Sequence, residues 1–311
     1  MILLLFLGVC TILAPKIEGQ TMTKAIIDFC DPQDVQSCGI GGRCVRLSLG
    51  NRCECPSGFM GRKCKRPCQD VYKSCKRWKS EDRCSWTRPI SPFFADNCAK
   101  SCGQCRSNGK ELALALPPIL DNIEWFVGRW ESRTMAPNRF PEPMSGPYKE
   151  ILDVQISDVP AFDRPPVNIS IRAETLDGQD IHLGYGFLTS KPFHEDTGFV
   201  EKNKPKTGDD LISIELVTNT GLMLIEEGTI KGTQIRLETK YKKSMAGIWR
   251  QEFAASKRLF ILVTPTSLEE RVIMVDSRGV KSKWLKRYQK VHDYMLDLIP
   301  TPPANPRSLF N

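Results

Sequence analysis

The alternation of hydrophobic and polar positions is clearest between Leu211 and Tyr241. Residues 234–241 place an apolar or β-branched side chain, or Tyr241, at every second position, which is typical of a strand with one buried face. Residues 212–216 repeat this pattern, and residues 222–225 are apolar on both faces. Gly221 and Gly232 lie between the three runs, where a hairpin turn needs a residue that tolerates a positive φ. The pattern predicts a three-stranded antiparallel meander.

The same alternation extends from Trp125 to Val291. A single open sheet of that length would leave its edge strands unpaired, so a closed antiparallel β-barrel is the simplest arrangement. Before the barrel, residues 111–124 predict a short apolar helix that is broken by Pro117-Pro118 and closes the barrel mouth. Residues 137–147 predict a proline-rich loop between the first two strands.

Two segments resemble a known family. The run GLMLIEEGTI, preceded by ELVTNT, resembles the central hairpin of nitrobindin-type proteins, and residues 125–131 resemble their opening strand, with Gly128 and Trp130 at the Gly-x-Trp positions. The resemblance covers residues 119–291. It implies a mainly β fold, a ten-stranded barrel related in shape to fatty-acid-binding proteins. It also implies a haem that reacts with nitric oxide or peroxynitrite.

The chain has thirteen cysteines, and twelve of them fall between Cys30 and Cys105. A dense, even-numbered block of this kind indicates small disulfide-stapled modules in a secretory setting. The apolar run Met1–Ala14, which contains Cys10, is too short to span a bilayer core of roughly 30 Å and predicts a signal peptide that ends at Gly19. An uncleaved N-terminal membrane anchor stays an alternative. Asn168-Ile-Ser170 is the only N-glycosylation sequon.

The first cysteine block, residues 28–65, ends in Cys-Glu-Cys-Pro-Ser-Gly-Phe-Met-Gly-Arg-Lys-Cys. This ending resembles an EGF-like domain, and the resemblance implies the pairs Cys30–Cys44, Cys38–Cys53 and Cys55–Cys64. One acidic residue precedes the first cysteine and no histidine stands at ligand spacing, so neither a calcium nor a zinc site is expected.

The second block, residues 67–106, closes with a C-x3-C-x2-C spacing. It resembles the ShK toxin module (ShKT domain), and the resemblance implies the pairs Cys68–Cys105, Cys75–Cys98 and Cys84–Cys102. Residues 107–118 are interpreted as a linker with a polar hinge at residues 106–110, which predicts a barrel, residues 119–293, that can be separated from the modules. Residues 294–311 predict a tail without order beyond a short apolar turn.

The net charge of +8 comes from one part of the chain. Residues 60–110 hold thirteen Lys and Arg against four Asp and Glu, and the rest is close to neutral. A basic module beside a neutral barrel predicts contacts with an acidic glycan or with an extracellular or cell-surface protein. No nucleic-acid motif accompanies the charge, so no nucleic-acid partner is expected.

The barrel has three candidate histidines, His182, His194 and His292, and no cysteine. The nitrobindin resemblance implies a haem-ligating histidine on the last strand, and alignment with residues 282–288 puts Lys283 at that position, or Trp284 if the register slips by one. Lysine ligates iron only when deprotonated, which its usual pKa near 10.4 opposes. His182, on an alternating strand, is a second candidate for ligand binding. No catalytic residues, metal site or cofactor are therefore expected, although haem stays an alternative.

The order of domains resembles nematode proteins that shape male sensory rays. That resemblance implies a non-catalytic extracellular or cell-surface role in epidermal and sensory-organ morphogenesis, with a barrel that is structural or holds an apolar small molecule. The alternative interpretation is a secreted haem protein that handles nitric oxide or peroxynitrite.

Overall fold

The computed structural model describes residues 30–39, 41–47, 50–61, 63–86, 93–158, 160–161, 165–190, 210–244 and 253–300. The predicted signal peptide or anchor, residues 1–19, and His194 lie outside these ranges. Within the described ranges, no helix has the length and apolar character needed to cross a membrane.

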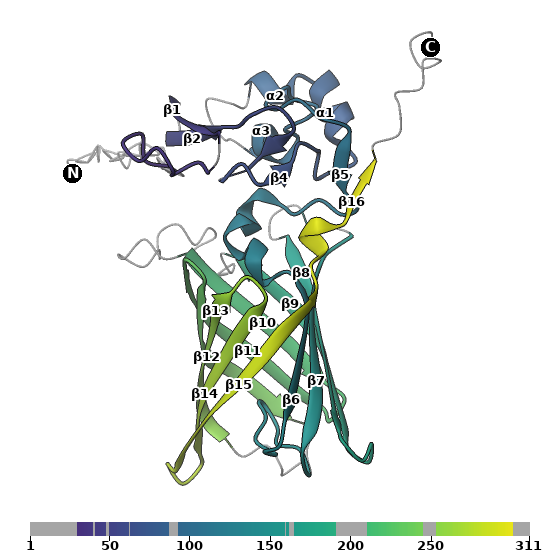
Figure 1. The fold of residues 1–311 in the computed structure, drawn as a ribbon, viewed down its shortest axis with the longest axis vertical. Helices are drawn as coiled ribbons and strands as arrows, with labels where there is room; N and C mark the ends of the chain where they lie inside the picture. Colours follow the sequence, from purple (N-terminus) through teal and green to yellow (C-terminus); the bar gives the residue numbers. More distant parts are fainter. Residues whose placement is uncertain are drawn as a thin grey trace, which may run out of the picture.

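Ten antiparallel strands form one closed barrel in the order β10–β11–β12–β13–β14–β15–β6–β7–β8–β9, which confirms the mainly β fold and the ten-stranded barrel (Figure 1). The strands are β6 (Gly128–Thr134), β7 (Tyr148–Ile156), β8 (Pro166–Thr175), β9 (Ile181–Ser190), β10 (Asp210–Thr218), β11 (Leu222–Lys231), β12 (Gln234–Ser244), β13 (Phe253–Thr264), β14 (Ser267–Asp276) and β15 (Lys281–His292). The meander predicted from residues 211–241 is β10–β11–β12.

Alternating side chains of each strand point into the barrel. In β8, Val167, Ile169 and Ile171 are buried, whereas the residues between them are partly exposed. Apolar side chains from neighbouring strands join them in one core that includes Trp130, Leu188, Ile214, Leu237, Phe260 and Leu268. Burial of this apolar surface is the main favourable contribution to the barrel's stability.

A 3₁₀ helix, η1 (Pro118–Phe126), closes the end of the barrel that faces the N-terminal modules (Figure 1). Leu120, Ile123 and Phe126 of η1 are fully buried in the core. Lys290 of β15 donates to the backbone oxygens of Trp125 and Val127, at 3.1 and 3.0 Å, and so satisfies carbonyls at the end of the helix. The apolar segment predicted to close the barrel mouth does so, as a 3₁₀ helix that starts at Pro118.

Gly128 starts the first barrel strand with a φ of 143°. A Cβ atom there would lie 2.6 Å from the backbone oxygen of His292, on the neighbouring strand β15. Only glycine allows the chain to leave η1 and approach β15 this closely.

The loop of residues 135–147 covers the opposite end of the barrel. Phe140 of this loop belongs to the core, and Met144 packs with Tyr148 in a smaller buried cluster. The hydroxyl of Tyr148 donates to the backbone oxygen of Asn138 at 2.9 Å. The loop between the first two strands is therefore packed into the barrel end.

The first cysteine module consists of two small sheets, β1 (Arg43–Leu47) with β2 (Gly50–Glu54) and β3 (Phe59–Met60) with β4 (Arg66–Pro67). Its three disulfides join Cys30 to Cys44, Cys38 to Cys53 and Cys55 to Cys64. These are the pairs that the EGF-like resemblance implies. A module this small buries little apolar surface, so its stability depends on the disulfides.

The second module contains three short helices, α1 (Cys75–Ser80), α2 (Arg83–Trp86) and α3 (Phe93–Asn97). Its disulfides join Cys68 to Cys105, Cys75 to Cys98 and Cys84 to Cys102, the pairs that the ShK resemblance implies. Trp78 is buried at its centre, and Tyr72, Phe93 and Phe94 pack around it. These aromatics form the small core of the module.

The modules contact each other and the segment that leads to the barrel, whereas the hinge at residues 106–110 and the separable barrel stay predictions. Gly58 donates its backbone N–H to Arg106 O at 2.7 Å, and residues 110–112 form β5 (Lys110–Leu112). The side chain of Gln69 exchanges two hydrogen bonds with the backbone of Leu112, at 3.2 and 2.7 Å. These contacts continue the second module directly into the segment that leads to η1.

The described residues after the barrel, 293–300, include the short apolar turn expected there. They form a 3₁₀ turn, η3 (Tyr294–Leu296), and a short strand, β16 (Leu298–Pro300). β16 pairs with β5, so that Leu298 lies opposite Leu112 (Figure 1). The start and the end of the barrel are thereby joined to each other.

Candidate functional site

Six charged side chains meet inside the barrel, and we call them the interior charge cluster. The cluster consists of Arg139, Glu150, Glu226, Arg258, Glu270 and Lys286, and every member is at least 94% buried. They come from the 135–147 loop and from β7, β11, β13, β14 and β15. Three positive and three negative charges balance one another, as buried charges require.

The cluster is a continuous series of ion pairs. Arg139 Nε lies 2.5 Å from Glu150 Oε2, and Lys286 Nζ lies 2.7 Å from Glu150 Oε1. Lys286 Nζ also lies 3.1 Å from Glu270 Oε2. The other oxygen of this carboxylate, Glu270 Oε1, lies 2.8 Å from Arg258 Nη2. Arg258 ends the series with an ion pair to Glu226. Removal of any inner member would leave a neighbour buried without its counter-ion.

Burial alone would raise the pKa of Glu150, but Lys286 and Arg139 outweigh that effect and lower it to about 2. The hydroxyl of Tyr288 lies 2.5 Å from Glu150 Oε1 and 3.0 Å from Glu270 Oε2. Burial and these two carboxylates hold the pKa of Tyr288 well above its usual value. Tyr288 therefore stays protonated, and its hydroxyl donates a hydrogen bond to the carboxylates of the cluster.

Glu226 differs from the other two carboxylates. Its Oε1 atom is buried and has no hydrogen-bond partner among the described residues. Burial raises the pKa of Glu226, and Arg258 offsets that effect only in part. Glu226 is thus the carboxyl of the cluster that is most easily protonated.

His182 of β9 lies beside the cluster, 8% exposed. Its Nδ1 atom is 3.3 Å from Arg139 Nη1, and its Nε2 atom is 3.0 Å from Asp180 Oδ1. Burial and Arg139 lower the pKa of His182, so the ring is neutral near pH 7. Because a guanidinium only donates, Nδ1 is the acceptor and Nε2–H donates to Asp180. A carboxylate that accepts from one ring nitrogen is the usual arrangement for a metal-ligating histidine.

Lys283, the other predicted ligand position, is on the wrong face of the barrel. In β15 the inward positions are Trp284, Lys286 and Tyr288, whereas Lys283 is exposed. Strand side chains alternate, so the one-residue slip decides which residue enters the barrel. Lys283 is therefore excluded as an interior ligand. Trp284 points inward, and its Nε1–H has no partner among the described residues.

β12 and β13 are paired over only part of their length. The ladder joins Gln234–Glu238 to Lys257–Ile261, and no pairing is found for the later residues of β12 that the structure describes. Lys242 Nζ lies over the ring of Phe253 at this place, 4.2 Å from its centroid. The part of β12 outside the ladder lies near the end covered by the 135–147 loop, and Thr239 there is hydrogen-bonded to Ser256 of β13.

Haem iron in proteins is held by histidine, cysteine, methionine or tyrosine side chains. Among the described residues inside the barrel, His182 has the best chemistry for this role, because it is neutral and its Nε2–H is held by Asp180. Its Nδ1 lone pair faces Arg139 in this conformation. His182 would hold a haem iron only if Arg139 moved away from Nδ1. His292 pairs with Asp297 outside the barrel, so its ring does not face the barrel interior.

The fold and the interior together define a closed ten-stranded antiparallel β-barrel with buried charges, preceded by disulfide-rich modules. Residues 119–290 match the THAP4-like, heme-binding beta-barrel domain, and the chain belongs to this family. Residues 67–105 match the ShK domain-like family, which confirms the ShK module.

Several known proteins are similar to this chain. An uncharacterized Caenorhabditis elegans protein is 23% identical over 67% of both chains. Proteins named peroxynitrite isomerase THAP4 from Rattus norvegicus and Mus musculus are each 24% identical over 57% of this chain, but the match spans only 28% of their length. The crystal structure of Rv2717c from M. tuberculosis covers 57% of this chain at 17% identity, with a TM-score of 0.40.

Two predictions are corrected by these findings. The expectation of no cofactor is overturned, because the matching family is described as heme-binding. The expectation that the chain is not an enzyme is likewise overturned, because relatives that match the barrel are named peroxynitrite isomerase. Both expectations rested on the missing histidine at Lys283, a position that does not face the interior.

The interior charge cluster was missed by sequence reasoning, although a signal existed. Glu150 is two residues before Leu152, and Lys286 is two residues before Tyr288. Residues two apart on a strand point to the same face, so both charged residues occupy inward positions. A charged residue at an inward position between buried neighbours indicates an oppositely charged side chain inside the barrel, because a buried charge must be paired. Glu226 and Glu227 are neighbours in β11 and point to opposite faces, and Glu226 is the buried one.

Proposed function

We propose that this protein binds haem in its barrel and converts peroxynitrite, in an extracellular setting. Membership of the heme-binding barrel family over residues 119–290 is the observation that carries the proposal. The names of the relatives from rat, mouse and cattle support the substrate. The six disulfides in the modules support an oxidising compartment.

In this proposal His182 is the iron ligand. Its neutral ring and the hydrogen bond to Asp180 keep one nitrogen available as a ligand and fix the tautomer. Arg139 Nη1 lies 3.3 Å from His182 Nδ1, so Arg139 would have to move before His182 could hold the iron.

Haem, when bound, would supply a redox-active iron for the rearrangement of the peroxynitrite anion. Isomerisation of peroxynitrite to nitrate rearranges the atoms of one anion, so the chain needs no separate redox partner for it. The chain's own contribution is the exclusion of water by the core and the orientation of His182 by Asp180. The positive charges of Arg139, Arg258 and Lys286 are each engaged by a carboxylate and require a rearrangement before they attract an anion.

The test is the absorption spectrum of the full chain after addition of haem. We expect a Soret band in the wild type that is lost in His182→Ala and kept in His292→Ala, since His292 lies outside the barrel. The yield of nitrate from added peroxynitrite should likewise be high in the wild type and in His292→Ala and low in His182→Ala. Absence of haem binding in the wild type would overturn the proposal. Loss of the band in His194→Ala alone would move the ligand to the segment between β9 and β10.

The modules support a second, complementary role in contacts. Lys76, Arg77 and Lys79 are exposed on α1 of the ShK module. Such a basic face fits an acidic glycan or an acidic cell-surface protein, consistent with a role in epidermal morphogenesis. Retention on a sulfated-glycan column should fall in Lys76→Glu/Lys79→Glu and remain in a variant with matched changes of Lys281 and Lys283 on the barrel. Equal retention of all three proteins would contradict a contact through α1.

A further inference from the structure

The outer face of β9, β10 and β11 carries a contiguous group of exposed apolar side chains, which we call the β9–β11 patch. Tyr185 and Phe187 of β9 are 61% and 49% exposed, and Val217 of β10 and Met223 of β11 are each 50% exposed. Tyr185 lies opposite Val217, and Val217 lies opposite Met223. The patch therefore crosses three neighbouring strands without interruption.

The N-glycosylation sequon lies along one edge of this patch. On β8, Asn168 is the cross-strand partner of Phe187, and Ser170 is the cross-strand partner of Tyr185. Directly opposed residues on one face of an antiparallel pair have Cβ atoms about 4.5–5.5 Å apart. Each polar residue of the sequon thus stands beside one exposed aromatic ring.

The side chain of Asn168 is available for modification. Val167 and Ile169 on either side of it point into the barrel, so Asn168 points outward and is partly exposed. No hydrogen bond of its amide to another described residue is present. The outward direction agrees with the requirement that a glycosylated asparagine faces solvent.

We propose that Asn168 carries an N-linked glycan whose first sugar packs on Phe187 and Tyr185 and covers the β9–β11 patch. The transfer forms a bond between Nδ2 of Asn168 and the anomeric carbon of a lipid-diphosphate-linked oligosaccharide, while the amide loses a proton and the lipid diphosphate leaves. The apolar face of a hexose ring matches an aromatic ring, and its hydroxyl groups remain in water. The sugar converts a hydrophobic surface into a hydrated one.

The occupant is a glycan rather than a protein because the acceptor asparagine is in the same cross-strand row as the patch. A sugar attached to Asn168 is present at high effective concentration beside Phe187 and needs no second binding event. The proposal uses the extracellular setting of the proposed function but not its haem chemistry, so the two can fail separately.

The experiment uses the full chain secreted from insect cells. Peptide mass spectrometry should find N-acetylhexosamine-containing glycan on Asn168 of the wild type. Asn168→Gln and Ser170→Ala each remove the glycan through a different residue, so effects common to both variants come from the sugar. Both should bind more hydrophobic dye than the wild type and unfold at a Tm about 1–4 °C lower.

A double-variant cycle tests the packing on the ring. Trimming the wild-type glycan to its first sugar should leave the Tm unchanged, because that sugar makes the contact. In a Phe187→Ser background, loss of the glycan should no longer lower the Tm or raise dye binding. An unmodified Asn168 peptide would overturn the proposal. So would a glycan whose removal has the same effect with and without Phe187, or a protein partner that binds the patch of the glycosylated wild type.

Discussion

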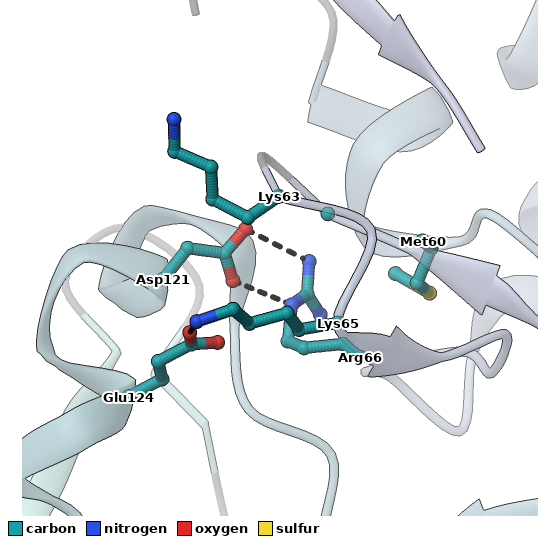
Figure 2. Close-up of a pocket in the computed structure, with 7 residues that line it drawn as sticks. Met60, Lys63, Lys65, Arg66, Asp121 and Glu124 are labelled. Atoms are coloured by element: carbon teal, nitrogen blue, oxygen red, sulfur yellow. Dashed lines mark hydrogen bonds and ion pairs between the residues drawn. The ribbon is translucent and has the colours of Figure 1, made fainter. Parts of the chain in front are cut away.

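Arg66 of β4 and Asp121 of η1 form a buried ion pair between the first module and the barrel. Arg66 Nε lies 2.5 Å from Asp121 Oδ1, and the two side chains are 3% and 6% exposed. Figure 2 shows the pair in a small pocket, with Lys65 and Glu124 beside it. Arg66 Nη1 also donates to the backbone oxygen of Leu116 at 2.8 Å. A module and the helix that closes the barrel are thereby held by one guanidinium.

Arg66→Met should lower the free energy of unfolding by about 3–5 kcal/mol, because it leaves Asp121 buried without its counter-ion. The matched control is Arg43→Met in the exposed Arg43–Glu54 pair, whose side chains are 75% and 58% exposed. Arg43→Met should lower the free energy of unfolding by at most about 1 kcal/mol. Chemical denaturation of both variants measures the difference, and equal small losses would show that Arg66 does not hold the module.

Reduction of the disulfides should destabilise the barrel as well as the modules. Each disulfide contributes about 2–4 kcal/mol to a small module. Once the modules unfold, the contacts of Arg66 and Gln69 with residues 112–121 are lost and η1 is less firmly held. We expect a lower Tm for the strand signal in circular dichroism after reduction, and no early protease cleavage at residues 106–112 of the oxidised chain. A barrel Tm that reductant leaves unchanged would contradict the docking.

Acid should weaken the barrel through Glu150. Its pKa is lowered to about 2 in the folded protein, against an ordinary value of 4.5, because Lys286 and Arg139 outweigh the effect of burial. The stabilisation is present above pH 4.5 and is lost as the pH falls towards 2. Glu150→Gln should be less stable at neutral pH, and its stability should depend less on pH in this window. Denaturation midpoints at several pH values measure both effects.

Glu226 should show the opposite dependence on pH. Burial raises its pKa above the ordinary value, so its contribution to stability is present at low pH and is lost as the pH rises through its folded pKa. Relative to the wild type, Glu226→Gln should gain stability as the pH is raised from about 4 to 7. A parallel pH series with Glu150→Gln is the control. Curves of the same sign for the two variants would show that the two carboxyls are not in different environments.

The fold was predictable because alternation is a local property. Each strand of the β10–β12 meander shows its buried face within a few residues, and the turn glycines mark its ends. Docking of the modules was not predictable, because Arg66 and Asp121 are distant in sequence and nothing near either residue indicates a partner. The hinge predicted at residues 106–110 followed from composition alone.

The candidate site was predicted only in part. His182 lies on an inward position and its ring is neutral, but its Nδ1 atom faces Arg139 in this structure. Lys283 was chosen from an alignment that could shift by one residue, and in a strand that shift exchanges inside for outside. The series of ion pairs from Arg139 to Glu226 depends on side chains that meet across the barrel, which no single-strand pattern contains.

The β5–β16 pair also determines how the molecule would respond to tension. Lys110 lies opposite Pro300, and Leu112 lies opposite Leu298 nearer the barrel. A pull between the modules and the segment after Pro300 would load the hydrogen bonds of this ladder one after another, from the outer end inward, as in a zipper. The ladder would therefore open at low force and lengthen the molecule while the barrel strands remain unloaded.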